Sequence, residues 1–176
     1  QEGAIVVDVA TGPGFMLLEL GSLLNNPNLI ACDASDIMLK IASEEAKKID
    51  LTVDVALCPA EKLILADNSV DVITSKQLLH EADDVDLVIQ EMSRVCKPGG
   101  CAFIIDFDGE SSKIGPWLLK QFIRLTAGGE TADGFWKSYT HGLAGSLVKE
   151  KMISAGFVDV DLERWGKNYF IKGYAQ

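Results

Sequence analysis

The sequence is poor in positive charge and in histidine. Its 176 residues include 16 Lys and Arg against 26 Asp and Glu, a formal net charge of −10. Because affinity for nucleic acids comes largely from neutralised phosphates, this balance disfavours a nucleic-acid partner. His80 and His141 are the only histidines, and no Cys-x-x-Cys pair accompanies them. The residue spacing therefore predicts no metal site.

Long apolar runs and paired cysteines are lacking as well. No run approaches the roughly 18 residues of a membrane-spanning helix, and no signal-peptide pattern opens the chain. The four cysteines (Cys32, Cys58, Cys96 and Cys101) each lie in or beside an apolar run, which is typical of reduced, packed thiols. We therefore expect a cytoplasmic protein without a membrane span, and its oligomeric state stays open.

What is present is an alternation of short β-branched runs with longer helical patterns. The patterns predict strands at 4–9, 28–33, 51–58, 70–75 and 101–107, helices at 14–24, 35–48, 85–96 and 143–155, and a final hairpin of strands at 157–165 and 168–174. The first helix is almost wholly apolar, which predicts that it packs deep against a sheet. Apolar strands alternating with helices indicate a doubly wound, mostly parallel, Rossmann-like α/β sheet. We expect one domain over residues 1–176.

The strongest local signal is a loop of small residues after the first strand. Ala10, Gly12 and Gly14 let the backbone turn sharply and let a ligand approach the main chain. Asp33 ends the next strand, where a carboxylate can accept both hydroxyls of a ribose. This combination predicts a nucleoside-containing cofactor, although a tight turn without a ligand is also possible.

Two cofactor classes use such a loop. The dinucleotide fingerprint G-x-G-x-x-G needs a small residue where Leu17 stands, and Pro13 has no N–H for a pyrophosphate. S-adenosylmethionine carries no phosphate, so neither residue opposes it. The residues therefore favour the methyl donor over NAD.

Five segments resemble one family in register and order: VVDVATGPG, CDASDIML, PAEKLILADNSVDVITS, LLHEADD and RVCKPGG. Together they resemble the class I S-adenosylmethionine-dependent methyltransferases, in the branch related to ubiquinone and menaquinone biosynthesis. The resemblance covers nearly the whole chain. It implies a seven-stranded sheet of order 3-2-1-4-5-7-6 with strand 7 antiparallel.

The resemblance also implies which residues contact S-adenosylmethionine. Each implied contact belongs to the methionyl end, the ribose or the adenine ring of the cofactor. The methionyl contacts are Asp8, the backbone of Ala10, Gly12 and Gly14, and the backbone of Ser75 and Lys76; Asp33 holds the ribose; Ala34, Met38, Ala60 and Glu61 lie around the adenine.

Three departures from the family pattern support an alternative function. Pro59 stands where the family usually has an adenine-binding Asp, and Lys76 stands where a neutral residue is common. Since a cation beside the sulfonium would oppose binding, we expect the Lys76 side chain to point away. The third departure is an expectation: this chain should lack the helices that in the family precede the first strand and cover the cofactor. The alternative is a binding module that holds the cofactor or a protein partner without catalysis.

The candidate catalytic residues follow the fourth and fifth strands. His80 is the candidate base, and Asp106 and Asp108 could orient an acceptor. Each also has a structural interpretation: a helix-start histidine with local hydrogen bonds, and aspartates that cap the next turn. Both interpretations stay open at the level of sequence.

Residues 108–141 are predicted to form an insertion that covers the substrate. Its aromatic residues could line an apolar pocket for a planar or lipid-like acceptor, or pack as the core of an inserted helical segment. These residues are Trp117, Phe122, Phe135, Trp136 and Tyr139, and Tyr139 and His141 are further candidate proton carriers. Motifs of nucleobase methylation are missing after the fourth strand, so we expect a small-molecule acceptor methylated at O, C or N.

Overall fold

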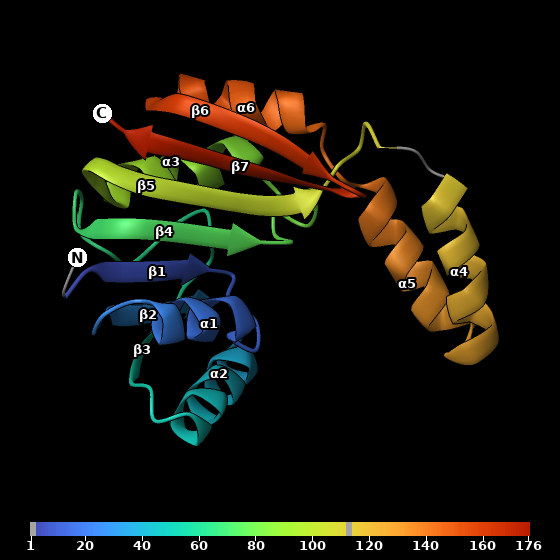
Figure 1. Ribbon diagram of the computed structural model, residues 1–176, viewed down its shortest axis with the longest axis horizontal. Coiled ribbons are helices and arrows are strands. Elements are labelled where there is room, and N and C mark those ends of the chain that lie inside the picture. Colours follow the sequence, from blue (N-terminus) through green and yellow to red (C-terminus); the bar gives the residue numbers. More distant parts are fainter. Residues whose placement is uncertain (1–2, 112–113) are drawn as a thin grey trace.

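The computed structural model describes residues 3–111 and 114–176 and contains a seven-stranded sheet in the order β3-β2-β1-β4-β5-β7-β6 (Figure 1). The strands are β1 (Ile5–Val9), β2 (Asn28–Asp33), β3 (Val53–Leu57), β4 (Val70–Lys76), β5 (Cys96–Phe107), β6 (Phe157–Trp165) and β7 (Asn168–Ala175). The helices are α1 (Phe15–Leu23), α2 (Asp36–Lys48), α3 (Val85–Val95), α4 (Ile114–Thr126), α5 (Gly129–Thr140) and α6 (Gly145–Ser154).

The strand directions confirm the predicted architecture. The pairs β2–β3, β1–β2, β1–β4 and β4–β5 are parallel, whereas β7 runs antiparallel to β5 and β6. Because connections between parallel strands cross over through helices, the carboxyl ends of β1, β2 and β4 meet at one edge. The register sets Asp8 beside Thr74 and Val9 beside Ser75 at this edge.

The two faces of the sheet are covered unequally. In Figure 1, α3 lies behind β4 and β5, α6 lies behind β6 and β7, α1 lies in front of β2, and α2 lies below β3. No helix lies in front of β5 and β7 in this view, and Phe103, Ile105 and Phe170 on that face are only half-buried. The prediction that α1 packs deep against the sheet is confirmed for Leu17, Leu18 and Gly21 and is wrong for Phe15 and Leu23 at its two ends, which are exposed.

The fifth strand begins earlier than predicted. It starts at Cys96, not Cys101, because Val70 pairs with Cys96 while Val72 pairs with Cys101. The Lys97–Gly100 turn is thus an irregularity within the strand, and Gly99 takes a φ of 78° there. A turn with two glycines can either precede a strand or interrupt one as a bulge. The sequence alone therefore did not determine where β5 begins.

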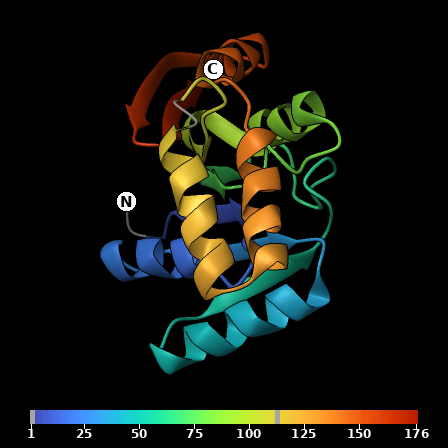
Figure 2. The same ribbon diagram turned by 90° about the vertical axis from the view of Figure 1, so that its right-hand side faces the viewer.

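Residues 108–141 contain two helices where the sequence pattern was weak. Helices α4 and α5 form a hairpin that stands beyond the carboxyl edge of the strands (Figures 1 and 2). In Figure 2, α4 lies on the side of α1 and α5 on the side of α3. Many apolar side chains of α4 face solvent. Its sequence therefore lacks the usual pattern of one apolar face toward the core and one polar face toward water. Among the described residues, every helix is too short or too polar to traverse a bilayer.

Gly14 lies at the start of α1, where the loop after β1 packs against α2. Its φ is 85°, and a Cβ built there would lie 2.9 Å from the Cβ of Ala42 in α2. Gly14→Val should therefore lower the free energy of unfolding by about 1–3 kcal/mol or more, through overpacking and backbone strain. Urea denaturation measures the change. Gly134→Ala is the matched control because its Cβ would meet nothing within 4 Å, and an equal loss in both variants would contradict the argument.

Candidate functional site

The loop after β1 leaves its backbone open, as the small residues predict. Ala10 and Gly12 have φ values of 55° and 54°, and a Cβ at Gly12 would meet nothing within 4 Å. Thr11 fixes the start of the turn by donating its N–H to the carbonyl of Cys32 in β2. The space beside Gly12 is therefore available for a ligand that approaches the main chain.

Asp8 is a buried carboxylate that organises this loop. Its two oxygens accept hydrogen bonds from the Thr11 hydroxyl at 2.8 Å and the Thr74 hydroxyl at 2.7 Å. Burial raises the pKa of Asp8 to about 6, although both hydroxyls act to lower it. Asp8 thus fixes the ends of β1 and β4 relative to each other, and its predicted contact with the methionyl group stays a prediction.

The raised pKa gives Asp8 a measurable effect on stability. A carboxyl group whose pKa is 3.8 unfolded and about 6 folded stabilises the fold at low pH, and loses that contribution as pH rises through 6. The free energy of unfolding of Asp8→Asn relative to wild type should therefore rise by about 2.4 kcal/mol between pH 4 and pH 7.5. Urea denaturation at both pH values measures this. Asp36→Asn should change in the opposite direction, because Lys40 lowers the pKa of Asp36.

Asp33 lies at the carboxyl end of β2 and faces the same loop. Its Oδ2 accepts the Gly12 N–H at 2.8 Å, and its Oδ1 accepts the Ser35 N–H at 2.9 Å. A cavity of about 220 Å³ lies beside it. The residues lining this cavity are Ala10, Asp33, Ala34, Cys58, Pro59, Ala60, Glu61, Leu78, Glu81, Ala82 and Asp83. We call this space the donor cavity.

The donor cavity brings together five of the residues expected to contact the cofactor: Ala10 at the methionyl end, and Asp33, Ala34, Ala60 and Glu61 around the nucleoside. Pro59 and the buried Cys58 also line it, and the Cys58 thiol donates to the carbonyl oxygen of Ala56. Met38 is half-buried and is not one of the lining residues; its N–H donates to the Ser35 hydroxyl at the start of α2. The contact predicted between Met38 and the adenine stays a prediction.

The remaining predicted positions lie at the end of β4. Ser75 is buried, and its hydroxyl has no hydrogen-bond partner among residues 3–111 and 114–176. Lys76 is exposed and borders a separate hollow, lined also by Phe15, Met16 and Ile105. The Lys76 side chain thus lies outside the donor cavity.

The segment that carries Pro59 and Ala60 is held from α3. Arg94 donates to the carbonyl oxygens of Leu63 and Leu65 at 3.0 Å each, and pairs with Asp67. Glu91 accepts from Arg94 and from the N–H of Leu63. These bonds satisfy the polar groups of an irregular segment, and they fix to a regular helix the chain that directly follows the cavity-lining residues 58–61.

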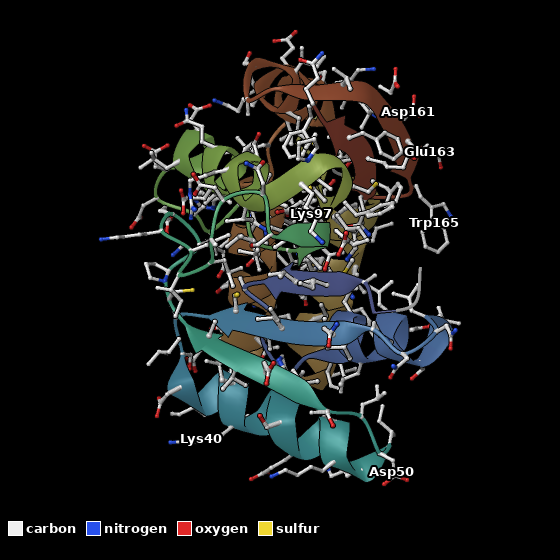
Figure 3. All side chains as sticks on the ribbon, turned by 90° about the vertical axis from the view of Figure 1, so that its left-hand side faces the viewer. Lys40, Asp50, Lys97, Asp161, Glu163 and Trp165 are labelled. Carbon is white, nitrogen blue, oxygen red and sulfur yellow. The ribbon has the colours of Figure 1, made fainter. Side chains whose placement is uncertain are left out.

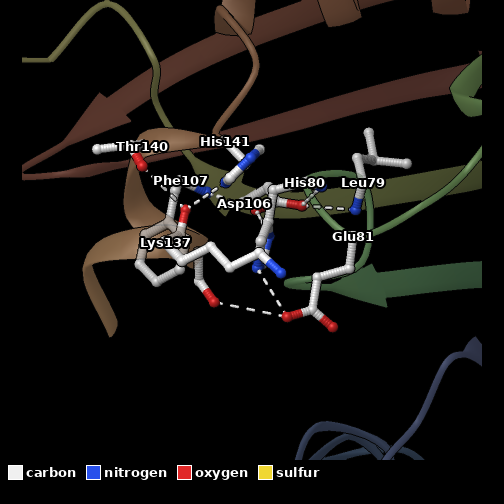
Figure 4. Close-up of polar contacts among 9 residues, drawn as sticks. Leu79, His80, Glu81, Asp106, Phe107, Lys137, Thr140 and His141 are labelled. Carbon is white, nitrogen blue, oxygen red and sulfur yellow. Dashed lines mark hydrogen bonds and ion pairs between the residues drawn. The ribbon is translucent and has the colours of Figure 1, made fainter. Parts of the chain in front are cut away.

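His80 and Asp106 form a buried pair at the same edge (Figure 4). His80 Nδ1 lies 2.6 Å from Asp106 Oδ1, and both side chains are at most 3% exposed. Asp106 also accepts the backbone N–H groups of Leu79 and Phe107. The interpretation of His80 as a helix-start residue with local bonds is therefore wrong: α3 begins at Val85, and the partner of His80 lies on β5. Because the carboxylate is fixed by backbone donors, it orients the imidazole.

The other ring nitrogen of His80 faces Glu81. His80 Nε2 lies 3.6 Å from a carboxylate oxygen of Glu81, which also accepts from the Ser138 hydroxyl at 3.5 Å (Figure 4). Burial lowers the pKa of His80, but the hydrogen bond and charge of Asp106, with the charge of Glu81, outweigh it and raise the pKa above 6.5. A space of about 400 Å³ beside this ring is lined by His80, Glu81, Lys137, Ser138 and His141. We call it the acceptor pocket.

Sequence reasoning missed Glu81, Lys137 and Ser138 in the acceptor pocket. Glu81 follows the candidate base and lines both the donor cavity and the acceptor pocket, and its place beside His80 was the one signal that could have found it. Lys137 and Ser138 come from α5, in the segment whose sequence pattern was weak. Their position depends on how the α4–α5 hairpin packs, which no local pattern encodes.

Asp108 has the structural role that its position suggested. It accepts the N–H of Glu110 in the next turn and of Gly145 at the start of α6, and pairs with Arg164.

The aromatic residues of the insertion divide into two groups. Phe135 and Trp136 each contact Tyr139. Trp117 and Phe122 are exposed, so core packing is wrong for these two.

The fold and the site together define a class I S-adenosylmethionine-dependent methyltransferase. Three features fit a nucleoside cofactor with a polar tail and no phosphate: the carboxylate at the end of β2, the open Gly12 backbone, and the Ser75 hydroxyl, which lacks a partner within the described part of the chain. Residues 7–104 match the family model described as "Methyltransferase domain". The chain belongs to this methyltransferase family, and its cofactor is S-adenosylmethionine.

Individual relatives agree with this assignment. The chain is 30% identical over 174 residues to the ubiquinone/menaquinone biosynthesis C-methyltransferase UbiE of Shewanella sp. strain W3-18-1, spanning 92% of this chain and 69% of that protein. A SAM-dependent methyltransferase from Aquifex aeolicus superposes with a TM-score of 0.72 at 28% identity, covering 99% and 82% of the two chains. A possible histamine N-methyltransferase from Thermotoga maritima shares the fold, with a TM-score of 0.69 at 21% identity, covering 100% and 83%.

Proposed function

We propose that this protein transfers a methyl group from S-adenosylmethionine to a carbon atom of a small-molecule acceptor held in the acceptor pocket. The observation that carries the proposal is that Glu81 lines both the donor cavity and the acceptor pocket. The two spaces therefore adjoin, as a direct transfer requires. Transfer to carbon is supported by the C-methyltransferase relative.

The donor side acts by binding and orientation. Asp33 would hold the ribose hydroxyls, and the open backbone at Ala10 and Gly12 would lie along the rest of the donor. S-adenosylmethionine, when bound, supplies an electrophilic methyl group on a sulfonium. The carboxylates of Asp33, Glu61 and Glu81 line the donor cavity, and their negative charge suits a cationic ligand. Fixed orientation of two reactants is worth roughly 7–11 kcal/mol of the barrier.

The acceptor side acts by moving a proton. A carbon nucleophile must lose a proton before or after it takes the methyl group, and His80 is the buried base oriented for this step. Asp106 is the positioning residue, because it fixes the Nδ1 side of the ring. Glu81 occupies the Nε2 side, so an acceptor must replace the Glu81 carboxylate at Nε2. We further propose that α4 and α5 cover this acceptor, and that the chain acts as one domain.

Isothermal titration calorimetry with S-adenosylmethionine, S-adenosylhomocysteine and NAD tests the donor assignment. We expect heat with the first two ligands and none with NAD, and heat with NAD alone would overturn it. Release of S-adenosylhomocysteine in the presence of phenolic or enolic acceptors, followed by mass spectrometry of the product, tests methyl transfer to carbon. A product methylated at oxygen or nitrogen would replace that part of the proposal.

A further inference from the structure

Glu81 belongs to both spaces of the site. In the described part of the chain it is the one residue that lines the donor cavity and the acceptor pocket alike. On the acceptor side its carboxylate lies 3.6 Å from His80 Nε2 and 3.5 Å from the Ser138 hydroxyl (Figure 4). Both distances are longer than those of a strong, charge-assisted hydrogen bond. The carboxylate is therefore held weakly in this position and is free to exchange its partners.

The backbone of Glu81 is fixed, whereas its side chain is not. The Glu81 N–H donates to the carbonyl of Leu78 at 2.9 Å, and the N–H groups of Leu79 and His80 donate to the buried Asp106 carboxylate. The Glu81 side chain is 69% exposed. The carboxylate can therefore rotate about its side-chain bonds between His80 Nε2 and the donor cavity, while the turn that carries it stays in place.

The charges on the two sides of Glu81 differ. On the donor side Glu81 lies with other carboxylates, those of Asp33, Glu61 and Asp83, and no basic side chain of the described residues lines the cavity. On the acceptor side the charged and titratable groups that face His80 come from several elements. They are Asp106 on β5, Lys137 on α5, His141 directly after α5, and Lys167 beyond the Phe107 ring that packs against His80. Glu81 thus lies between a cavity that suits a cation and a ring that becomes a cation when it takes up a proton.

We infer that Glu81 is a shared counter-ion: its carboxylate pairs with the positive charge of the donor before methyl transfer and with protonated His80 after it. The inference rests on the proposed function. In the transfer the bond between the methyl group and the acceptor carbon forms as the bond to sulfur breaks, and that bonding pair stays on sulfur. The acceptor C–H bond gives its proton to His80 Nε2 and leaves its electron pair on the acceptor. One positive charge therefore leaves the sulfur and one appears on the imidazole, both within reach of Glu81.

The inference predicts that the charge of the donor sets the protonation of His80. With S-adenosylmethionine bound, Glu81 turns toward the donor, so the pKa of His80 falls and the neutral base is favoured. S-adenosylhomocysteine has no charge on sulfur, so Glu81 stays at Nε2 and keeps the pKa of His80 raised. Asp106 acts on the ring equally in both complexes. We expect the acid dissociation constant of His80 to differ at least roughly threefold between them, a modest effect because Glu81 is exposed to solvent.

Nuclear magnetic resonance of isotope-labelled histidine measures this difference without turnover, because no acceptor is added. The chain has two histidines, and the variant His141→Gln assigns both signals. The pH midpoint of His80 should be lower with saturating S-adenosylmethionine than with saturating S-adenosylhomocysteine. The midpoint of His141 should change less, since His141 lines the acceptor pocket and not the donor cavity.

Three substitutions separate the role of Glu81 from other causes. Glu81→Gln fills the same space without the charge and should reduce the difference between the two complexes. Glu81→Asp keeps the charge and should retain part of the difference. Glu163→Gln is the matched control, because it removes an exposed carboxylate from β6, the outer strand of the sheet (Figure 3), and it should preserve the difference.

Three outcomes would overturn the inference. The first is the same His80 midpoint in both complexes, and the second is an undiminished difference in Glu81→Gln, which would assign the effect to direct repulsion between the donor and the imidazolium. The third is an equal reduction in Glu163→Gln and Glu81→Gln. Calorimetry distinguishes this failure from that of the proposed function: a chain that binds neither ligand contradicts both, whereas binding without a change at His80 contradicts the inference alone.

Discussion

His80→Ala should lower turnover by roughly 10²–10⁴-fold while the dissociation constant of S-adenosylmethionine stays close to that of the wild type. The reason is geometric. His80 is oriented by Asp106 at 2.6 Å and lies in the acceptor pocket, whereas the residues of the donor cavity do not include it. Single-turnover kinetics with saturating donor measure the chemical step, and calorimetry measures donor affinity. Unaltered turnover would leave His80 with a structural role only.

The pH profile distinguishes a base from a residue that merely fills space. A histidine base must be neutral, so activity should rise with pH and reach half its maximum above pH 6.5, because Asp106 and Glu81 raise the pKa of His80. Asp106→Asn removes one of these charges and should shift the rise to lower pH. His141→Ala removes the other imidazole of the acceptor pocket and should not shift the profile. A shift in His141→Ala alone would transfer the role to that residue.

Asp33→Ala should weaken S-adenosylmethionine binding by roughly 10- to 100-fold, since a hydrogen bond to a charged group contributes about 1.5–3 kcal/mol. Asp33 also holds the Gly12 N–H at 2.8 Å, so its removal loosens the backbone that the donor would contact. Calorimetric titration gives the dissociation constant, and the melting temperature without donor reports any loss of fold.

Two further variants sharpen the test of Asp33. Asp33→Asn keeps one carbonyl acceptor and removes the charge, so it should show a smaller loss of affinity. Asp36→Ala removes a carboxylate three residues further on, which pairs with Lys40 at the surface, and this variant should bind the donor as the wild type does. If Asp33→Ala and Asp36→Ala bind S-adenosylmethionine with equal affinity, Asp33 does not contribute to donor binding.

The sheet and the donor side of the site were predictable from the sequence because both are encoded locally. Alternating apolar runs give the strands, and Ser35 and Asp84 mark the starts of α2 and α3, where their side chains accept backbone N–H groups. The turn residues Ala10 and Gly12 and the carboxylate of Asp33 stand at fixed places in a β–α–β unit. The fold then brings them together without any further information.

The acceptor side was only partly predictable, because its contacts depend on long-range packing. His80 and Asp106 were each candidates, but their direct bond follows from the parallel pairing of β4 with β5. The boundaries of α4 and α5 were not predicted from the sequence. A helix is usually recognised by apolar residues that face a core, whereas the large apolar residues of α4 face solvent. Lys137 and Ser138 reach the acceptor pocket only through the α4–α5 hairpin.

The hydrogen bonds and the ion pair of Arg94 affect how the enzyme binds S-adenosylmethionine. Arg94 and Glu91 hold the chain from Leu63 to Asp67 with side-chain and carbonyl contacts, so the neighbouring Pro59–Glu61 stretch is anchored before any ligand arrives. A wall that is already rigid loses little conformational entropy on association. Amide hydrogens of residues 60–65 should therefore exchange slowly even in the free enzyme, and Arg94→Met should make their protection depend on S-adenosylmethionine.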